Sequence, residues 1–83
     1  MAVRAVHHRD YQMVPSLLRR MREDAELTQR ELADLLGHLQ QTIHSSETGS
    51  RRVDIGEYCR WAEACGVDAH DALDRYLNVR PKS

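Results

Sequence analysis

The chain has few cysteines, and their spacing argues against a metal or disulfide site. Only two occur in 83 residues, Cys59 and Cys65. Two residues six positions apart on a helix point to different faces, so this pair predicts neither a metal site nor a disulfide. We expect two small, buried, apolar side chains instead. Such cysteine usage is typical of a reducing compartment, and we expect the protein to be cytoplasmic.

Long apolar runs and catalytic spacings are also missing. No segment is long and apolar enough to span a membrane, and we expect no signal peptide. There is no glycine-rich phosphate loop, and the five histidines form no Ser-His-Asp or Cys-His arrangement. Asp68, His70, Asp71 and Asp74 form the one cluster that suggests a metal, but Asp68 is placed to cap a helix. We therefore expect no enzymatic activity, no metal and no cofactor.

Positive charge is not in excess, but it is unevenly distributed. The net charge is −1, which by itself does not indicate a nucleic-acid binder. Between Asp54 and Asp74 there are six acidic residues and one base, Arg60. Six of the other arginines gather at positions 19, 20, 22, 30, 51 and 52. We expect one acidic and one basic face, and we interpret Arg19, Arg20 and Arg22 as a solvated helix face.

The most informative stretch is Leu27–Arg52, which begins with a short amphipathic helix. Thr28 and Glu31 have the spacing of a capping box, in which each side chain bonds to the other residue's backbone N–H. Leu32, Leu35 and Leu36 follow at positions that form one apolar face. Gly37 comes directly after them and favours the end of the helix.

A second short helix is predicted over Gln40–Glu47, ended by Gly49. Ile43 is its only strongly apolar residue, and most of the others are neutral hydrogen-bonding residues. A glutamine side chain can bond to adenine N6 and N7 in the major groove, so this surface suits a helix that reads bases. The alternative is that these polar residues form only a solvated face.

Together these motifs resemble the Cro/repressor (XRE) family of helix-turn-helix DNA-binding proteins, from about Leu17 to Leu77. The matching residues read Leu-Thr-Gln-x-Glu-Leu-Ala-x-x-Leu-Gly, then Gln-x-Thr-Ile, then Glu-x-Gly-x-Arg-Arg. The resemblance implies an all-α, five-helix, lambda-repressor-like domain. It implies base contacts from Gln40, Gln41, His44 and Ser45. It implies DNA backbone contacts from Gln29, Thr42, Ser50, Arg51 and Arg52.

The sequence departs from the family pattern at three structural positions. Leu39 stands where the family usually has a serine or threonine cap, and Ser46 replaces an apolar residue that packs inward. Glu26 stands where a glycine commonly ends the first helix. We expect the recognition helix to lack its usual cap and to be held less firmly. His44 and Ser45 are also unusual residues to face bases.

The remaining segments are interpreted as scaffold around this motif. Residues 1–13 are expected to form a flexible arm, residues 14–77 the domain, and residues 78–83 a tail. Asp54 with Glu57, and Asp68 alone, are positioned to cap two further helices.

These features predict a sequence-specific transcriptional regulator, with repression the favoured activity. A single recognition helix covers few base pairs, so we expect a homodimer on a pseudo-palindromic double-stranded operator. The expected dimer contacts are apolar side chains near the C-terminal end: Trp61, Leu73, Tyr76, Leu77 and Val79. The rival interpretation is a helix-turn-helix module that has lost DNA binding and docks a protein partner. Fold alone does not separate the two.

Overall fold

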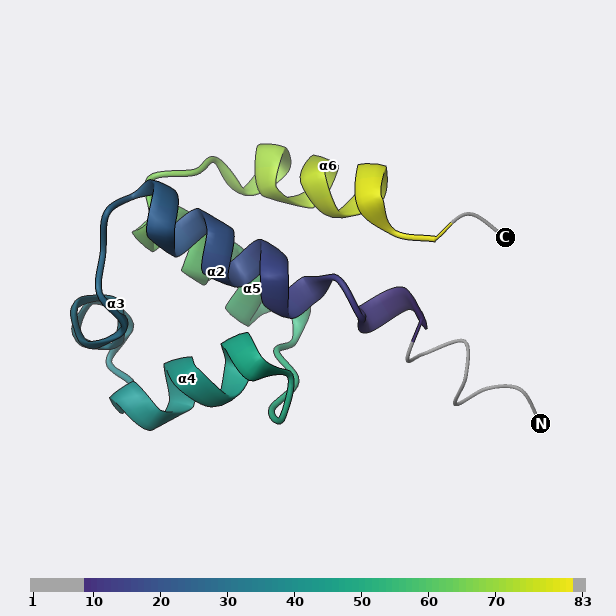
Figure 1. Ribbon diagram of the computed structural model, residues 1–83. Coiled ribbons are helices and arrows are strands. Elements are labelled where there is room, and N and C mark those ends of the chain that lie inside the picture. The colour runs from purple at the N-terminus through teal and green to yellow at the C-terminus, as the bar shows by residue number, and fades with distance from the viewer. Residues whose placement is uncertain (1–8, 82–83) are drawn as a thin grey trace.

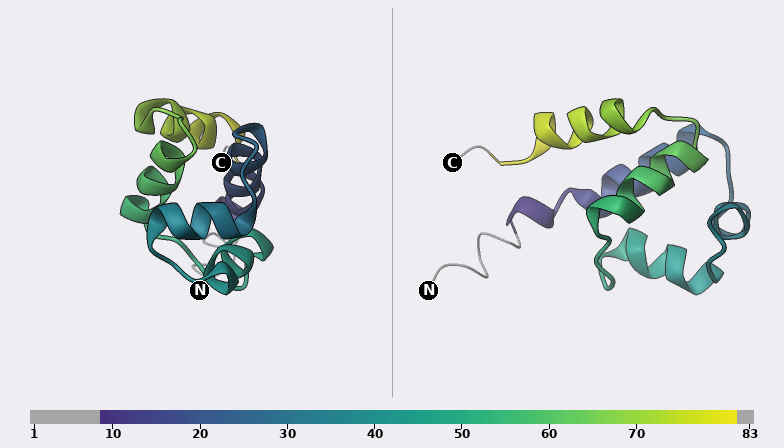
Figure 2. Two further views of the ribbon diagram at one scale, coloured as in Figure 1. Left: turned by 90° about the vertical axis from the view of Figure 1, so that its left-hand side faces the viewer. Right: turned by 180° about the vertical axis from the view of Figure 1, so that it is seen from behind.

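The computed structural model describes residues 9–81, and this part of the chain contains a short helical segment at residues 9–11, five helices from α2 to α6, and no strand. The helices are α2 (Val14–Asp24), α3 (Gln29–Leu36), α4 (Gln40–Thr48), α5 (Ile55–Ala64) and α6 (Ala69–Val79). Figure 1 shows α2 and α5 side by side, with α4 on one side of them and α6 on the other. The views in Figure 2 agree. The predicted all-α architecture is confirmed, and none of the described helices is long and apolar enough to cross a membrane.

Local hydrogen bonds set several helix boundaries where the sequence predicts them. At the start of α3, Thr28 Oγ1 accepts the Glu31 N–H at 3.0 Å, and Glu31 Oε1 accepts the Thr28 N–H at 2.8 Å. Asp54 and Glu57 form the same reciprocal box at the start of α5. Gly37 ends α3 in a left-handed conformation with φ 70°. These helix boundaries are therefore specified by short-range chemistry.

The core lies where α2, α3, α4 and α5 meet. Its fully buried side chains include Leu18 and Met21 of α2, Leu32 of α3, Ile43 of α4 and Ala62 of α5. These helices are separated in the sequence, so the shared burial of their apolar residues joins all four into one unit.

Two aromatic side chains fasten α5 to its neighbours through buried hydrogen bonds. Trp61 Nε1 donates to the Leu18 carbonyl of α2 at 2.9 Å, and the Tyr58 hydroxyl donates to the Ala72 carbonyl of α6 at 2.6 Å. A buried aromatic residue with a satisfied polar group is a core residue, not a surface one. The prediction that Trp61 belongs to a dimer surface is therefore wrong, since only 2% of it is exposed.

The apolar face predicted for α3 is also partly wrong. Leu32 is fully buried and Leu36 half-buried, but 61% of Leu35 is exposed. The buried stripe includes Ala33 instead. At about 100° per residue, Leu35 lies on nearly the opposite side of the helix from Ala33.

The packed domain starts earlier in the chain than predicted. Residues 1–8 of the expected arm lie outside the described residues. In the described part, the Tyr11 hydroxyl accepts the Val53 N–H at 2.8 Å, and the Tyr76 hydroxyl donates to the Asp10 carbonyl at 3.0 Å. These bonds join the segment before α2 to α6 and to the loop after α4.

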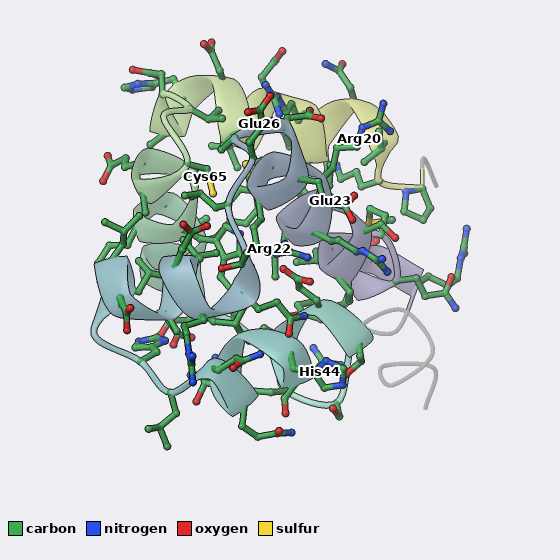
Figure 3. All side chains as sticks on the ribbon, turned by 60° about the vertical axis from the view of Figure 1, so that its left-hand side comes forward. Arg20, Arg22, Glu23, Glu26, His44 and Cys65 are labelled. Atoms are coloured by element: carbon green, nitrogen blue, oxygen red, sulfur yellow. The ribbon has the colours of Figure 1, made fainter. Side chains whose placement is uncertain are left out.

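Glu26 offers a test of backbone strain in the loop after α2. It is the one described non-glycine residue with a positive φ, 60°, and Figure 3 shows it in the link between α2 and α3. Because a side chain is disfavoured in this conformation, Glu26→Gly should raise the free energy of unfolding by about 0.5–1 kcal/mol. Urea denaturation followed by circular dichroism measures the change.

Gly37→Ala serves as the opposite control, since Gly37 also has a positive φ and an added Cβ would meet no atom within 4 Å. This variant should lose stability by about 1 kcal/mol. A loss of stability in Glu26→Gly would contradict the assignment of strain to Glu26.

Candidate nucleic-acid interface

Helix α4, the predicted recognition helix, has distinct inner and outer faces. Ile43 and Ser46 are fully buried against the core. Gln40, Gln41 and His44 are exposed on the outer face. The structure therefore presents three of the four predicted base-contacting side chains to solvent.

Two further polar residues of α4, Ser45 and Thr42, are half-buried. Ser45 lies beside the outer face, where its Oγ is 3.4 Å from Gln41 Nε2. Thr42 is turned further inward, and its carbonyl accepts the Ser46 hydroxyl at 2.8 Å. Neither residue is fully removed from the surface.

The start of α4 lacks a side-chain cap, as the sequence predicts. Leu39 occupies the N-cap position with an extended backbone, φ −78° and ψ 149°, and has no side chain able to accept a hydrogen bond. Its carbonyl accepts the Thr42 N–H at 3.0 Å. The helix is therefore held in place by contacts along its inner face and at its other end.

A buried ion pair anchors the end of α4 to α2. Arg22 Nε lies 2.6 Å from Glu47 Oε2, and Arg22 Nη2 donates to Glu47 Oε1 at 3.0 Å. The side chains are only 11% and 3% exposed. Arg22 Nη1 also donates to the Leu27 carbonyl at 2.7 Å, and Gln29 Nε2 donates to Glu47 Oε1 at 3.1 Å. This cluster joins α2, the following loop, α3 and α4.

The interpretation of Arg22 as part of a solvated face is therefore wrong. Figure 3 shows it in the middle of the domain, while Arg20 and Glu23 lie on the outer side of α2. The Glu47 carboxylate raises the pKa of Arg22 above its ordinary value, mainly through the hydrogen bond. Its partner Glu47 lies 25 positions away, so no local motif marks the pair.

Arg51 is engaged by the protein itself. Its Nη2 is 2.5 Å from Glu57 Oε2 in α5, and its Nη1 donates to Ser46 Oγ at 3.2 Å. The hydrogen bond from Arg51, together with the one from the Asp54 N–H, holds the pKa of Glu57 below its ordinary value. The buried hydroxyl of Ser46, which departs from the family pattern, thus has two partners: the Thr42 carbonyl and Arg51.

Arg52 has a different environment from its neighbour. It is exposed, and its guanidinium carbon lies 4.9 Å from the centre of the Tyr11 ring, a cation–π arrangement. Ser50 is also exposed, with its Oγ near the Ser45 carbonyl and 3.1 Å from Thr48 Oγ1. The loop after α4 therefore presents Ser50 and Arg52, while Arg51 joins α4 to α5.

One group of exposed acidic side chains lies away from α4. The acidic side chains Glu63, Asp68, Asp71 and Asp74 are exposed on or next to α5 and α6. The carboxylate of α4, Glu47, is neutralised inside the core. Since α6 lies on the far side of α2 and α5 from α4 (Figure 1), the outer face of α4 stays clear of this acidic group.

The side chains considered for metal binding have structural roles. Asp68 Oδ1 accepts the His70 N–H at 2.8 Å at the start of α6, and this bond lowers the pKa of Asp68. Cys65 is buried, which raises the pKa of its thiol to about 11, so it stays protonated at neutral pH. Cys59 is half-buried, and both cysteines are free thiols.

A tight turn followed by a helix with a neutral, exposed outer face defines a helix-turn-helix domain. A family model described as a helix-turn-helix domain matches residues 16–78. An "XRE-family like protein" from Pseudomonas syringae pv. tomato str. DC3000 has a similar structure, with a TM-score of 0.83 and 31% sequence identity over 96% of this chain and 98% of that chain. No curated protein matches significantly. The chain belongs to the XRE-type helix-turn-helix family of DNA-binding regulators, which confirms the predicted resemblance.

The buried ion pair gives the second prediction. Glu47→Gln keeps the shape of the side chain but leaves Arg22 without a counter-charge, and Arg22 is only 11% exposed. Breaking a buried pair on one side should lower the free energy of unfolding by about 3 kcal/mol. Urea denaturation monitored by Trp61 fluorescence measures the loss.

The exposed pair between Arg19 and Glu23 provides a matched control. Its atoms are 3.0 Å apart, but the side chains are 62% and 51% exposed. Glu23→Gln should change stability by less than about 0.5 kcal/mol. Equal effects of the two substitutions would show that burial of the Arg22–Glu47 pair does not matter.

Proposed function

We propose that this protein is a sequence-specific transcriptional repressor that inserts α4 into the major groove of double-stranded DNA. The observation that carries the proposal is the division of α4: its inner face is anchored by Arg22–Glu47, and its outer face presents neutral hydrogen-bonding groups. Neutral donors and acceptors suit base edges, which carry no net charge. Occupying a promoter requires only DNA binding, so repression is the simplest regulatory outcome.

Gln40, Gln41, His44 and Ser45 are the proposed base-reading residues. The first two stand at the N-terminal end of α4, the part of a recognition helix that contacts bases in related geometries. His44 is one turn further along, and Ser45 adjoins Gln41. Their exposure or partial exposure in the free protein leaves them ready to exchange water for base edges.

Gln29, Thr42, Ser50, Arg51 and Arg52 are the proposed backbone contacts. Arg52 is the best placed, because it is exposed and its guanidinium rests on Tyr11. Arg51 is shared between this role and its bond to Glu57. Gln29 is shared in the same way, since its amide nitrogen bonds to Glu47. Phosphate contacts of this kind set the register of the protein and carry no sequence information themselves.

We further propose a homodimer on a pseudo-palindromic operator, formed through Leu73, Tyr76, Leu77 and Val79. Three of these are large apolar side chains left exposed on α6, and Tyr76 is half-buried next to them. A two-fold pair buries the same patch on both subunits. The helix lies away from α4 (Figure 1), so pairing would leave the reading face open.

Selection of bound sequences from a random duplex pool tests the central proposal. The expected result is an enriched motif with two-fold symmetry. A pool that stays random would overturn the proposal and favour a protein-docking module. Expression of a reporter placed behind the enriched site then tests repression.

The third prediction concerns Gln41. Gln41→Ala should weaken binding to the selected site by about 1–3 kcal/mol and relax preference at one base position, because a side chain that bonds to a base edge is lost. Binding is measured by fluorescence anisotropy on selected and random duplexes. Glu63→Gln changes an exposed side chain on α5, outside both proposed contact surfaces, and should change neither value. Equal losses on both duplexes would exclude base reading by Gln41.

The fourth prediction separates the two loop arginines. Arg52→Ala should weaken binding to all duplexes and lower the slope of log K against log salt by about one unit, with little loss of stability. Arg51→Ala should lower binding and also stability, because it breaks the bond between α4 and α5. Arg75→Ala on α6 is the control for charge and should leave the slope unchanged. A changed sequence preference at constant slope would refute a phosphate contact for Arg52.

The fifth prediction concerns assembly. Sedimentation should show two copies on one selected duplex. The two half-sites in the selected sequence should be centred roughly 10 base pairs apart, about 34–36 Å along the DNA. Leu77→Glu places like charges on both sides of the proposed interface and should separate the copies. A wild-type protein that binds the whole selected duplex as a single copy, with no second copy even at saturation, would rule out the dimer.

A further inference from the structure

The residue directly before α4 carries an apolar side chain that the fold does not use. Leu39 is 76% exposed, the highest value among the large apolar side chains described as exposed. It is the N-cap residue, and its side chain makes no capping hydrogen bond. A serine, threonine, aspartate or asparagine at this position would stabilise the helix by accepting a backbone N–H. Leu39 thus contributes neither to the core nor to the cap.

The position of Leu39 places it beside the proposed reading residues. It immediately precedes Gln40 and Gln41, both exposed, at the N-terminal end of α4. This end of a recognition helix is directed toward base edges in the major groove. With α4 in the major groove, as proposed above, a leucine at this point would lie in the groove together with the two glutamine side chains.

The major groove offers one apolar group to such a side chain: the 5-methyl group of a pyrimidine. Thymine carries it, and 5-methylcytosine carries the same group at the same place. Contact would remove both the methyl group and Leu39 from water, a favourable change roughly proportional to the apolar area buried.

We propose that Leu39 is a specificity-determining residue that packs against a pyrimidine 5-methyl group in each half-site. The inference rests on the proposed function, because it requires α4 to lie in the major groove. It adds to the hydrogen-bonding contacts of Gln40 and Gln41 an apolar contact that distinguishes thymine from unmethylated cytosine by shape.

Removing one thymine methyl group at a time from the DNA tests this contact. Each thymine of the selected duplex is replaced in turn by deoxyuridine, which removes the methyl group and keeps the base pair. At one symmetric position the wild-type protein should bind about three- to tenfold more weakly, as expected for loss of one buried methyl-sized contact. Leu39→Ala should bind the thymine and uracil duplexes at that position equally.

Two further arms identify the source of the effect. A duplex with 5-methylcytosine at that position should bind wild type more tightly than one with cytosine, and Leu39→Ala should not distinguish them. Leu35→Ala is the matched control, since Leu35 is a similarly exposed leucine, 61%, in α3. It should keep the full preference for thymine over uracil.

The variant Leu39→Ser distinguishes loss of the methyl contact from loss of folding. This variant can supply the missing cap, so it should unfold at a higher urea concentration than wild type while losing the preference for the methyl group. The proposal is overturned if no uracil substitution weakens wild-type binding, or if Leu39→Ala and Leu39→Ser keep the same preference. If only the Leu39 proposal fails, the selection experiment still gives an enriched, tightly bound motif. If the proposed function fails, no motif is enriched.

Discussion

The buried ion pair between Arg22 and Glu47 is the constraint on which the placement of α4 depends. A charge with so little exposure is strongly destabilising unless it is paired, so each member fixes the other. The bidentate geometry specifies orientation as well as distance. Since Leu27 and Gln29 bond to the same pair, the loop and α3 are aligned with α4 at one point. The angle between the two helices of the motif is thus determined from inside the domain.

A second polar link compensates for an unusual core residue. Ser46 brings a hydroxyl into a fully buried position, and it is satisfied by the Thr42 carbonyl and by Arg51. Arg51 in turn bonds to Glu57, which also completes the capping box of α5. One loop side chain therefore connects the end of α4 to the start of α5. The cost of burying this hydroxyl is reduced because it has hydrogen-bond partners inside the protein, and the bond from Arg51 also links α4 to the loop after it.

Local chemistry was readable from the sequence, and long-range chemistry was not. The capping box of Thr28 and Glu31 and the missing cap at Leu39 can both be predicted from residues that lie within three positions of each other. Both predictions are confirmed. The error at Leu35 came from assigning a face by spacing when a neighbouring alanine also packs inward. The role of Arg22 was missed because its partner is distant, and an arginine on an amphipathic helix is usually solvated. Exposure of Gln40 and Gln41 was predicted correctly, while their contacts with bases stay predictions.

The division of α4 into inner and outer faces has an evolutionary consequence. Its anchoring side chains, Ile43, Ser46 and Glu47, share no position with the outward-facing Gln40 and Gln41. Substitutions at exposed positions without structural contacts usually change stability by less than about 0.5 kcal/mol. Under the proposed function, a lineage could therefore change the DNA target by exchanging the outer residues one at a time, without passing through an unfolded intermediate. The scaffold separates heritable change in recognition from the risk of losing the fold.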